Sequence, residues 1–249
     1  MSINRFKVVV PSFESVEWLE KCLESLEGQD FLDYDACVVD DASTDEKQRD
    51  IILRFCKKNQ WNYVFHKKNL GVLPSIIDGI KNLNPEDEDV ILLLDGDDWL
   101  YDEEVLEKLY EIYSDEDRDI LLTYGREIHY PSGTILPMRE LPLYVSENNV
   151  FREHPWIISA PRTFKHVLWK NIKDKDLRDL DGNYYNMSND VAFMLPMLEM
   201  AGERTQMVED ILYVYNRENP LSHHHVDSKK QKQVEIFLRK QKKYKKLEM

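Results

Sequence analysis

Residues 90 to 99 read V-I-L-L-L-D-G-D-D-W, an apolar run that ends at three aspartates grouped around one glycine. Five consecutive apolar residues bounded by a polar turn are typical of a strand that is buried on both faces of a sheet. Residues 102–113 follow with the pattern of a helix. This stretch therefore predicts a buried parallel strand, an acidic turn at its carboxyl end, and a helix packed behind it.

Three similar units precede this one. Apolar runs predict strands at residues 6–10, 36–39 and 61–65. Helical patterns follow each strand, at residues 16–26, 45–59 and 74–83. Gly28 stands as a C-terminal cap, and Pro74 stands at a helix start, where its missing N–H does no harm. Such alternation predicts an α/β fold with a mostly parallel central sheet and helices on both faces.

The regular alternation of predicted strands and helices ends after residue 118. The sequence predicts a strand at 120–124, a loop or hairpin at 131–143, helices at 161–172 and 190–201, and a last strand at 211–215. Residues 228–247 contain no glycine or proline and predict a basic C-terminal helix. We expect one domain over residues 1–227, with halves 1–118 and 119–227, followed by this helix in 228–249.

Composition and charge limit the possible functions. The chain has 249 residues and a mass of 29.7 kDa, which suffices for one large domain with a real core. Its formal net charge is −14 at pH 7, although residues 229–249 carry nine Lys or Arg against two Glu. A negatively charged chain lacks the general attraction to phosphate backbones, so we expect no nucleic-acid partner.

The cysteines and the apolar runs indicate a compartment. Cys22, Cys37 and Cys56 show no metal-ligand spacing and stand among apolar or helical residues, which suits a reducing environment. The N-terminus lacks a leader pattern, and no apolar run approaches the roughly 18 residues of a membrane span. We therefore expect a cytoplasmic protein without a transmembrane segment.

Three predicted strands end in polar segments. The first ends at P-S-F-E (11–14), the second at Asp40 and Asp41, and the fourth at residues 95–98. Ligands bind outside the carboxyl ends of the strands in an open parallel sheet, so these segments mark the place to look for a site. Crowded carboxylates repel one another, and such a cluster normally binds a cation or accepts hydrogen bonds from ribose and base. Mg²⁺ or Mn²⁺ carrying a diphosphate is the economical interpretation, because hard cations complete their coordination with phosphate and water.

Simpler interpretations of these segments stay open at this point. Residues 43–46 have the pattern of a capping box for the next helix, and residues 95–98 match an ordinary acidic turn. An EF-hand loop is excluded because Trp99 occupies the third acidic position. The chain also contains no G-x-G-x-x-G dinucleotide fingerprint and no P-loop.

Several motifs occur in a fixed order along the chain. They are V-V-V-P-S-F-E (8–14), V-V-D-D-A-S-T-D (38–45), N-L-G-V (69–72) and L-L-D-G-D-D-W (93–99). S-N-D-V-A (188–192), Y-V-Y-N-R (213–217) and N-P-L-S-H-H (219–224) follow them. Together these motifs resemble a family 2 glycosyltransferase with the Rossmann-like GT-A fold, over roughly residues 5–226.

The resemblance implies a metal-dependent, inverting hexosyltransferase. Its donor would be UDP-glucose, UDP-galactose or an N-acetylated relative, and its acceptor a hydroxyl of a glycan, a lipid-linked molecule or a protein. Asp190 would be the general base. The nucleotide-sugar would be held by Pro11, Phe13, Glu14, Asp41, Gly71, Asp95, Gly96 and Asp97. Mn²⁺ or Mg²⁺ would be held by Asp97, Asp98 and His224.

The sequence also departs from the family and leaves rival functions open. Val72, Leu73 and Pro74 follow Gly71, where many relatives carry a basic residue. Asp190 suits a helix start by itself, and the histidines at 223–225 suit a solvated loop. The rivals are a D-x-D phosphatase, a nucleotide-sugar-binding protein without turnover, and, as the weakest, a structural role of the basic tail.

The basic C-terminal segment has three possible partners. Its apolar residues cluster loosely, which disfavours an anionic membrane as the partner. We expect it to pack against the acidic domain or against a second subunit in a homo-oligomer, with Phe237 and Leu238 as the buried contacts.

Overall fold

The computed structural model describes residues 5–220 and 228–248 of the chain. Its first half contains the elements β1 (Phe6–Ser12), α1 (Leu19–Glu27), β2 (Tyr34–Asp40), α2 (Glu46–Asn59), β3 (Asn62–Phe65), α3 (Val72–Leu83), β4 (Val90–Leu93), β5 (Trp99–Leu100) and α4 (Val105–Tyr113). All strands and helices predicted for this half are present, with shifted ends. Strand β5 was not predicted, because two residues carry no periodicity.

The second half is less regular. It contains β6 (Leu122–Tyr130), β7 (Thr134–Ile135), α5 (Leu143–Glu147), β8 (Arg162–Lys165), α6 (His166–Lys170), η1 (Asp174–Leu177), α7 (Asn189–Ala201), η2 (Gly202–Arg204), β9 (Thr205–Asn216) and α8 (Ser228–Arg239). Helix α7 ends where Gly202 adopts a φ of 59°, a conformation that favours glycine. None of the helices in the described ranges is long and apolar enough to span a bilayer.

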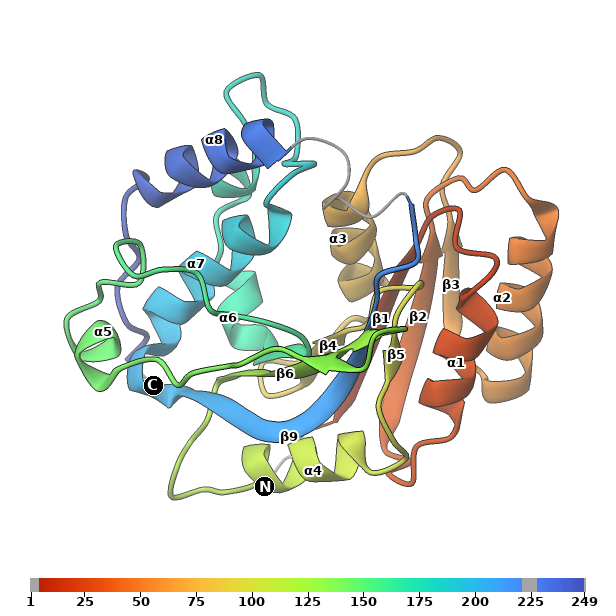
Figure 1. Cartoon of the computed structure of the whole chain (residues 1–249), viewed down its shortest axis with the longest axis horizontal. Coiled ribbons are helices and arrows are strands. Elements are labelled where there is room, and N and C mark those ends of the chain that lie inside the picture. Colours follow the sequence, from red (N-terminus) through yellow and green to blue (C-terminus); the bar gives the residue numbers. More distant parts are fainter. Residues whose placement is uncertain (1–4, 221–227, 249) are drawn as a thin grey trace.

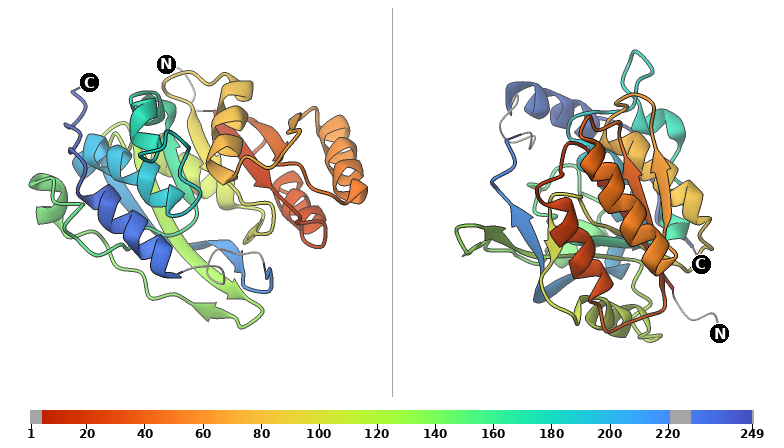
Figure 2. Two further views of the ribbon diagram at one scale, coloured as in Figure 1. Left: turned by 90° about the horizontal axis from the view of Figure 1, so that it is seen from above. Right: turned by 90° about the vertical axis from the view of Figure 1, so that its right-hand side faces the viewer.

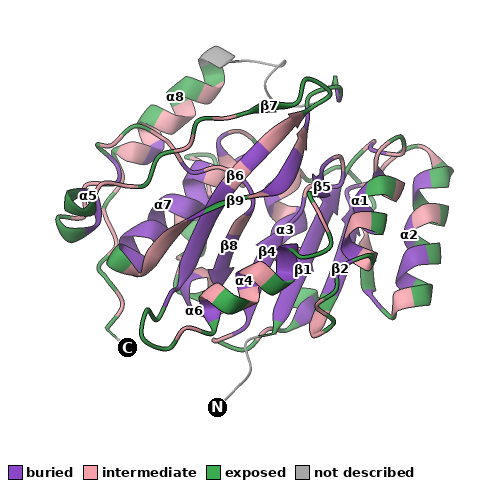
Figure 3. Ribbon diagram, turned by 60° about the horizontal axis from the view of Figure 1, so that its bottom comes forward, coloured by how far each residue is buried: buried purple, intermediate pink, exposed green. Residues whose placement is uncertain are grey.

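One sheet joins both halves in the order β3-β2-β1-β4-β8-β6-β9-β5, with β7 paired to β6 (Figures 1 and 3). The pairs among β3, β2, β1 and β4 are parallel, as is the pair β6 and β9. Strand β8 is antiparallel to both of its neighbours, β4 and β6. The mixed α/β fold with a largely parallel sheet confirms the fold class that the sequence predicts.

Alternate residues of the central strands are buried on opposite faces of the sheet, as their period of two requires. Helices α1, α2 and α4 cover the face that carries Val8, Val38 and Leu92. Helices α3, α6 and α7 cover the face that carries Val9 and Ile91. Figure 3 shows buried central strands between helices whose outer surfaces are exposed. Loops lie at the edge of the sheet where the parallel strands end.

One local prediction is wrong, and one interpretation that the sequence left open is not found in the structure. Residues 161–172 form strand β8 and the short helix α6 instead of one helix, because Arg162–Lys165 pairs with strands on both sides. The capping box at residues 43–46 is absent: Asp45 caps α2 by accepting the N–H of Lys47 at 2.9 Å. The Ser43 hydroxyl accepts the N–H of Glu14 instead.

The C-terminal segment packs along α7 of its own chain (Figure 2). Leu238 is buried, and Phe237 packs at the edge of the same cluster. The Leu247 N–H donates to the Met200 carbonyl at 2.9 Å. The helical part ends at Arg239 rather than at 247, and the rest of the segment continues without helix. These contacts favour the intramolecular partner over a second subunit.

Candidate active site

The three polar segments predicted at strand ends lie side by side. The Asp41 N–H donates to the Ser12 carbonyl and the Gly96 N–H donates to the Pro11 carbonyl, both at 2.9 Å. A side chain at position 96 would not fit, because a Cβ there would lie 2.8 Å from the Cβ of Ser12. Glycine therefore allows the acidic turn after β4 to rest directly on the end of β1.

The acidic turn holds three carboxylates in different environments. Asp98 is buried, and its oxygens accept the Tyr213 hydroxyl at 2.8 Å and the Asn216 N–H at 2.7 Å. Asp97 is half-buried and accepts the Asn219 side-chain amide at 2.7 Å. The buried Asp98 carboxylate therefore anchors the turn to β9.

Burial and neighbouring charges raise the pKa values of two carboxylates in the turn. Burial, followed by the charge of Asp97, raises the pKa of Asp95 to about 6. Burial and the charges of Asp97 and Asp95 hold the pKa of Asp98 well above its usual range, even though Asn216 and Tyr213 donate to it. A cation at the turn would relieve this repulsion. The residues present therefore fit a hard divalent cation.

The protein does not supply a complete metal cage in the part of the chain that the structure describes. No group of three or more His, Cys, Asp and Glu side chains is arranged there to hold a metal ion. His224, one of the predicted ligands, lies outside the described residues. A cation at Asp97 would complete its coordination with diphosphate oxygens and water, as Mg²⁺ commonly does.

Asp190 reaches the same site from the other half of the chain. It is the second residue of α7, and its Oδ1 accepts the Val191 N–H at 2.9 Å. Its Oδ2 lies 3.3 Å from Nη2 of Arg162, which stands on β8. Arg162 also interacts electrostatically with Asp95 and with Glu127 on β6. The arginine thus lies among carboxylates from the acidic turn, from β6 and from α7.

The far side of the site is formed by the ends of β1 and β2. Phe13 exposes 40% of its surface, whereas Pro11 is buried within β1. Glu14 has a φ of 48° and accepts the Thr44 N–H at 2.7 Å, which fixes the turn beside Phe13. Asp41 is buried and accepts the N–H groups of Leu70 at 2.8 Å and Gly71 at 2.7 Å.

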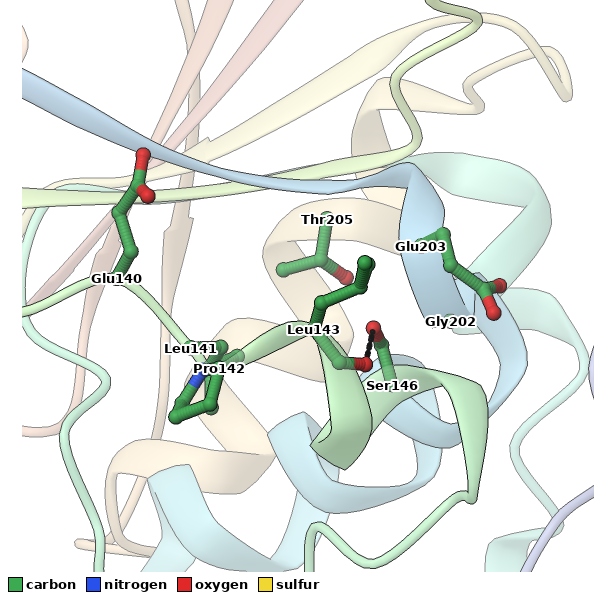
Figure 4. Close-up of a pocket in the computed structure, with 8 residues that line it drawn as sticks. All are labelled: Glu140, Leu141, Pro142, Leu143, Ser146, Gly202, Glu203 and Thr205. Atoms are coloured by element: carbon green, nitrogen blue, oxygen red, sulfur yellow. Dashed lines mark hydrogen bonds between the residues drawn. The ribbon is translucent and has the colours of Figure 1, made fainter.

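A cavity elsewhere in the molecule is not part of this site. It has a volume of about 440 Å³ and lies among Glu140, Leu143, Gly202 and Thr205 (Figure 4). Thr205 is the first residue of β9, and Asn216, which contacts the acidic turn, is the last. The cavity therefore lies at the opposite end of that strand from the carboxylates.

Comparison with known proteins identifies the family. Residues 7–169 match the model described as "Glycosyl transferase family 2". The chain belongs to this family. An uncharacterized glycosyltransferase of Rickettsia felis is 30% identical over 102 residues, which make up 41% of this chain and 16% of that relative. The chain thus spans about one sixth of the length of that curated relative.

Solved structures agree on the fold of this family 2 member. S. aureus TarS in complex with UDP-GlcNAc is 19% identical with a TM-score of 0.63, over 86% of this chain and 59% of that chain. A mannosyltransferase from Pyrobaculum calidifontis, in complex with GDP-Man and Mn²⁺, is 17% identical with a TM-score of 0.60, over 90% and 60% of the two chains. At these identities the likeness shows a shared GT-A fold.

Sequence reasoning missed several residues that lie around the acidic turn and Asp190. Arg162 was hidden in a segment predicted as helix, and Glu127 lies beyond the predicted end of a strand. Tyr213, Asn216 and Asn219 belong to motifs that had been quoted without a role. In the sequence these three residues stand out as polar positions in and after the last predicted strand. Their partners in the acidic turn are more than 110 positions away, so the sequence does not show which residues they contact.

Proposed function

We propose that this family 2 glycosyltransferase transfers a hexose from a UDP-sugar to an acceptor hydroxyl, with inversion at the anomeric carbon. The observation that carries the proposal is that Arg162 lies between Asp190 and the acidic turn that follows β4. One half of the chain supplies groups suited to a nucleoside diphosphate, and the other half supplies a carboxylate 3.3 Å from the arginine between them.

The nucleoside end of the donor fits the ends of β1 and β2. Asp41 is proposed to accept the N–H of uracil, and the exposed ring of Phe13 offers a face on which the base stacks. Asp95 is proposed to hold ribose hydroxyls. Gly71 and Gly96 are proposed to contact the donor through their backbone. Gly71 has a φ of 95°, a conformation that favours glycine, and Gly96 rests on Ser12.

Asp97 is the better candidate for the metal ligand than Asp98. Both oxygens of Asp98 already accept hydrogen bonds from Tyr213 and Asn216, and the side chain is buried. We therefore assign Asp98 to the support of the turn and Asp97, with His224 as the proposed second ligand, to Mn²⁺ or Mg²⁺. When bound, the cation would offset the negative charge that develops on the leaving diphosphate.

Asp190 is proposed to accept the proton of the acceptor hydroxyl. The hydroxyl oxygen forms the new bond to the anomeric carbon while the bond to the diphosphate breaks, and UDP leaves with the bonding electrons. Asp190 is suited to this role because its side chain retains 26% exposure and is held by Val191 N–H and Arg162. The acceptor is proposed to be a glycan, lipid-linked or protein hydroxyl, and the compartment the cytoplasm.

The test is a turnover assay with UDP-hexoses and Mn²⁺, in which UDP release is measured with a panel of sugar acceptors. Asp190→Asn should lower transfer by about 10²- to 10⁴-fold, the usual contribution of a positioned general base. Its UDP affinity, measured by calorimetry, should stay unchanged. Asp181→Asn, at an exposed loop carboxylate, is the matched control and should transfer normally. Full activity of Asp190→Asn would reject the assigned base.

A further inference from the structure

His66 is held between two carboxylates beside the nucleotide end of the site. Its Nδ1 lies 2.7 Å from Oδ1 of Asp41, and its Nε2 lies 3.1 Å from Oδ2 of Asp78. The ring is buried, with 6% of its side-chain surface exposed, whereas Asp78 retains 44%. Each ring nitrogen is thus within hydrogen-bond distance of one carboxylate oxygen, so the imidazole bridges Asp41 and Asp78.

The backbone fixes where this histidine stands. His66 directly follows β3, and its N–H donates to the Asp40 carbonyl at 2.9 Å. Asp78 comes from α3, which lies close to the sheet because the next residue is Gly79. A Cβ at Gly79 would lie 2.4 Å from a methyl carbon of Val9. The close approach of α3 therefore brings Asp78 within reach of the ring.

These contacts occupy most of the hydrogen-bond acceptor positions of the Asp41 carboxylate. Its Oδ1 accepts His66 and the Leu70 N–H, and its Oδ2 accepts the Gly71 N–H. Each carboxylate oxygen offers two acceptor positions. Among the described residues, one position therefore remains on Oδ2. A single N–H donor from a ligand would complete the carboxylate.

We propose that His66 and Asp78 determine base selectivity by holding Asp41 in the orientation that accepts one N–H from the nucleobase. This inference rests on the proposed function and adds two residues to its nucleotide site. Uracil presents a ring N–H at its pairing edge, whereas cytosine presents an acceptor nitrogen there. A fixed Asp41 carboxylate opposite cytosine would face another hydrogen-bond acceptor, which weakens binding. By holding Asp41 in place, His66 and Asp78 therefore select UDP over CDP.

The experiment compares the affinities of the full chain for UDP and CDP by calorimetry with Mn²⁺ present. The unmodified chain should bind UDP at least about 10²-fold more tightly than CDP, since a polar site strongly rejects a ligand that cannot pair with it. His66→Leu should weaken UDP binding by about 10-fold or more, as expected for a lost hydrogen bond to a charged group. CDP binding should change little, so the UDP/CDP ratio should fall.

Two further variants separate positioning from folding. His66→Asn keeps an amide N–H near the place of Nδ1 and should recover part of the ratio. Asp78→Asn replaces a half-exposed carboxylate and should lower the ratio by about 3-fold, the effect of a weakened outer hydrogen bond. Asp50→Asn, at an exposed position of α2, is the matched control and should leave the ratio unchanged. Thermal midpoints report whether each variant is folded.

The possible results are distinguishable. An equal loss of UDP and CDP binding in His66→Leu would show a purely structural histidine and overturn the proposal. An unchanged ratio in both His66→Leu and Asp78→Asn would overturn it as well. If His66→Leu does not fold, an unchanged ratio in Asp78→Asn alone overturns it. Failure of the unmodified chain to bind UDP would appear before any variant is made and would overturn the proposed function together with this inference.

Discussion

Removing the charge of Arg152 should destabilise the protein strongly. Its guanidinium is 2.5 Å and 2.9 Å from the two carboxylate oxygens of Glu199 and 2.6 Å from the Leu238 carbonyl. Arg152 and Glu199 are buried, with Glu199 fully inaccessible. Arg152→Met would leave the Glu199 carboxylate with the Tyr244 N–H at 2.8 Å but without its counter-charge.

The magnitude follows from the burial of the pair. Breaking a buried ion pair by removing one partner costs about 3–5 kcal/mol, because the remaining charge stays in a low-dielectric environment. For a domain of this size each kcal/mol corresponds to roughly 2–4 °C in the thermal midpoint. We therefore expect Arg152→Met to lower the midpoint by roughly 10 °C and to lower the urea midpoint at an unchanged slope.

Two controls isolate the buried charge as the cause. The double variant Arg152→Met with Glu199→Leu removes both charges and should regain most of the lost stability. Lys246→Met breaks the ion pair with Glu203, in which both side chains are more than one third exposed, and should cost less than about 1 kcal/mol. A loss for Arg152→Met no larger than that for Lys246→Met would refute the reasoning, as would a double variant less stable than the single one.

The remaining predictions concern the acidic turn. UDP affinity measured by calorimetry should fall sharply in EDTA, because without the metal the diphosphate is repelled by the carboxylates of the turn. An unchanged affinity would reject the proposed metal site. Asp98→Ala should lower the urea midpoint, since the Tyr213 hydroxyl and the Asn216 N–H lose a buried acceptor at a cost of about 1–3 kcal/mol. The raised pKa of Asp95, about 6, means that its ionisation opposes folding, so without metal its contribution to stability falls as pH rises from about 4 to 6. Asp95→Asn should therefore raise the thermal midpoint more at pH 7.5 than at pH 4.5, and an equal change at both pH values would contradict this. Manganese affinity should drop further in His224→Ala than in His223→Ala or His225→Ala, and an equal effect of all three would indicate adventitious binding.

The parts of the fold that could be predicted depend on short-range pattern. The run Val90–Leu94 and its acidic turn needed only local composition, and the parallel order placed Asp41 and Asp95 at one edge. Residues 162–168 could not be assigned in the same way. Phe164, Val167 and Leu168 fit a helical spacing, but strand pairing on both sides of residues 162–165 overrides that local preference. Arg162 was missed for this reason.

The parts of the site that escaped prediction depend on long-range contacts. The hydrogen bond between His66 and Asp41 joins positions 25 apart, and the bond between Tyr213 and Asp98 joins positions 115 apart. No periodicity encodes which polar groups meet when β9 pairs with both β6 and β5. Sequence pattern therefore located the carboxylates, while the contacts that hold them needed the packed structure.

Tyr213 shows how the second half of the chain organises the acidic turn. Its hydroxyl accepts the Asp95 N–H at 3.1 Å and donates to Asp98 at 2.8 Å. Burial, followed by the charges of Asp98 and Asp95, holds the pKa of this phenol well above its usual range, so the hydroxyl keeps the proton that it donates. The same strand supplies the Asn216 N–H to Asp98 and leads to Asn219, which contacts Asp97. The position of the turn is therefore set by β9. A change that displaces β9 should disturb the acidic turn even where every carboxylate of that turn is intact.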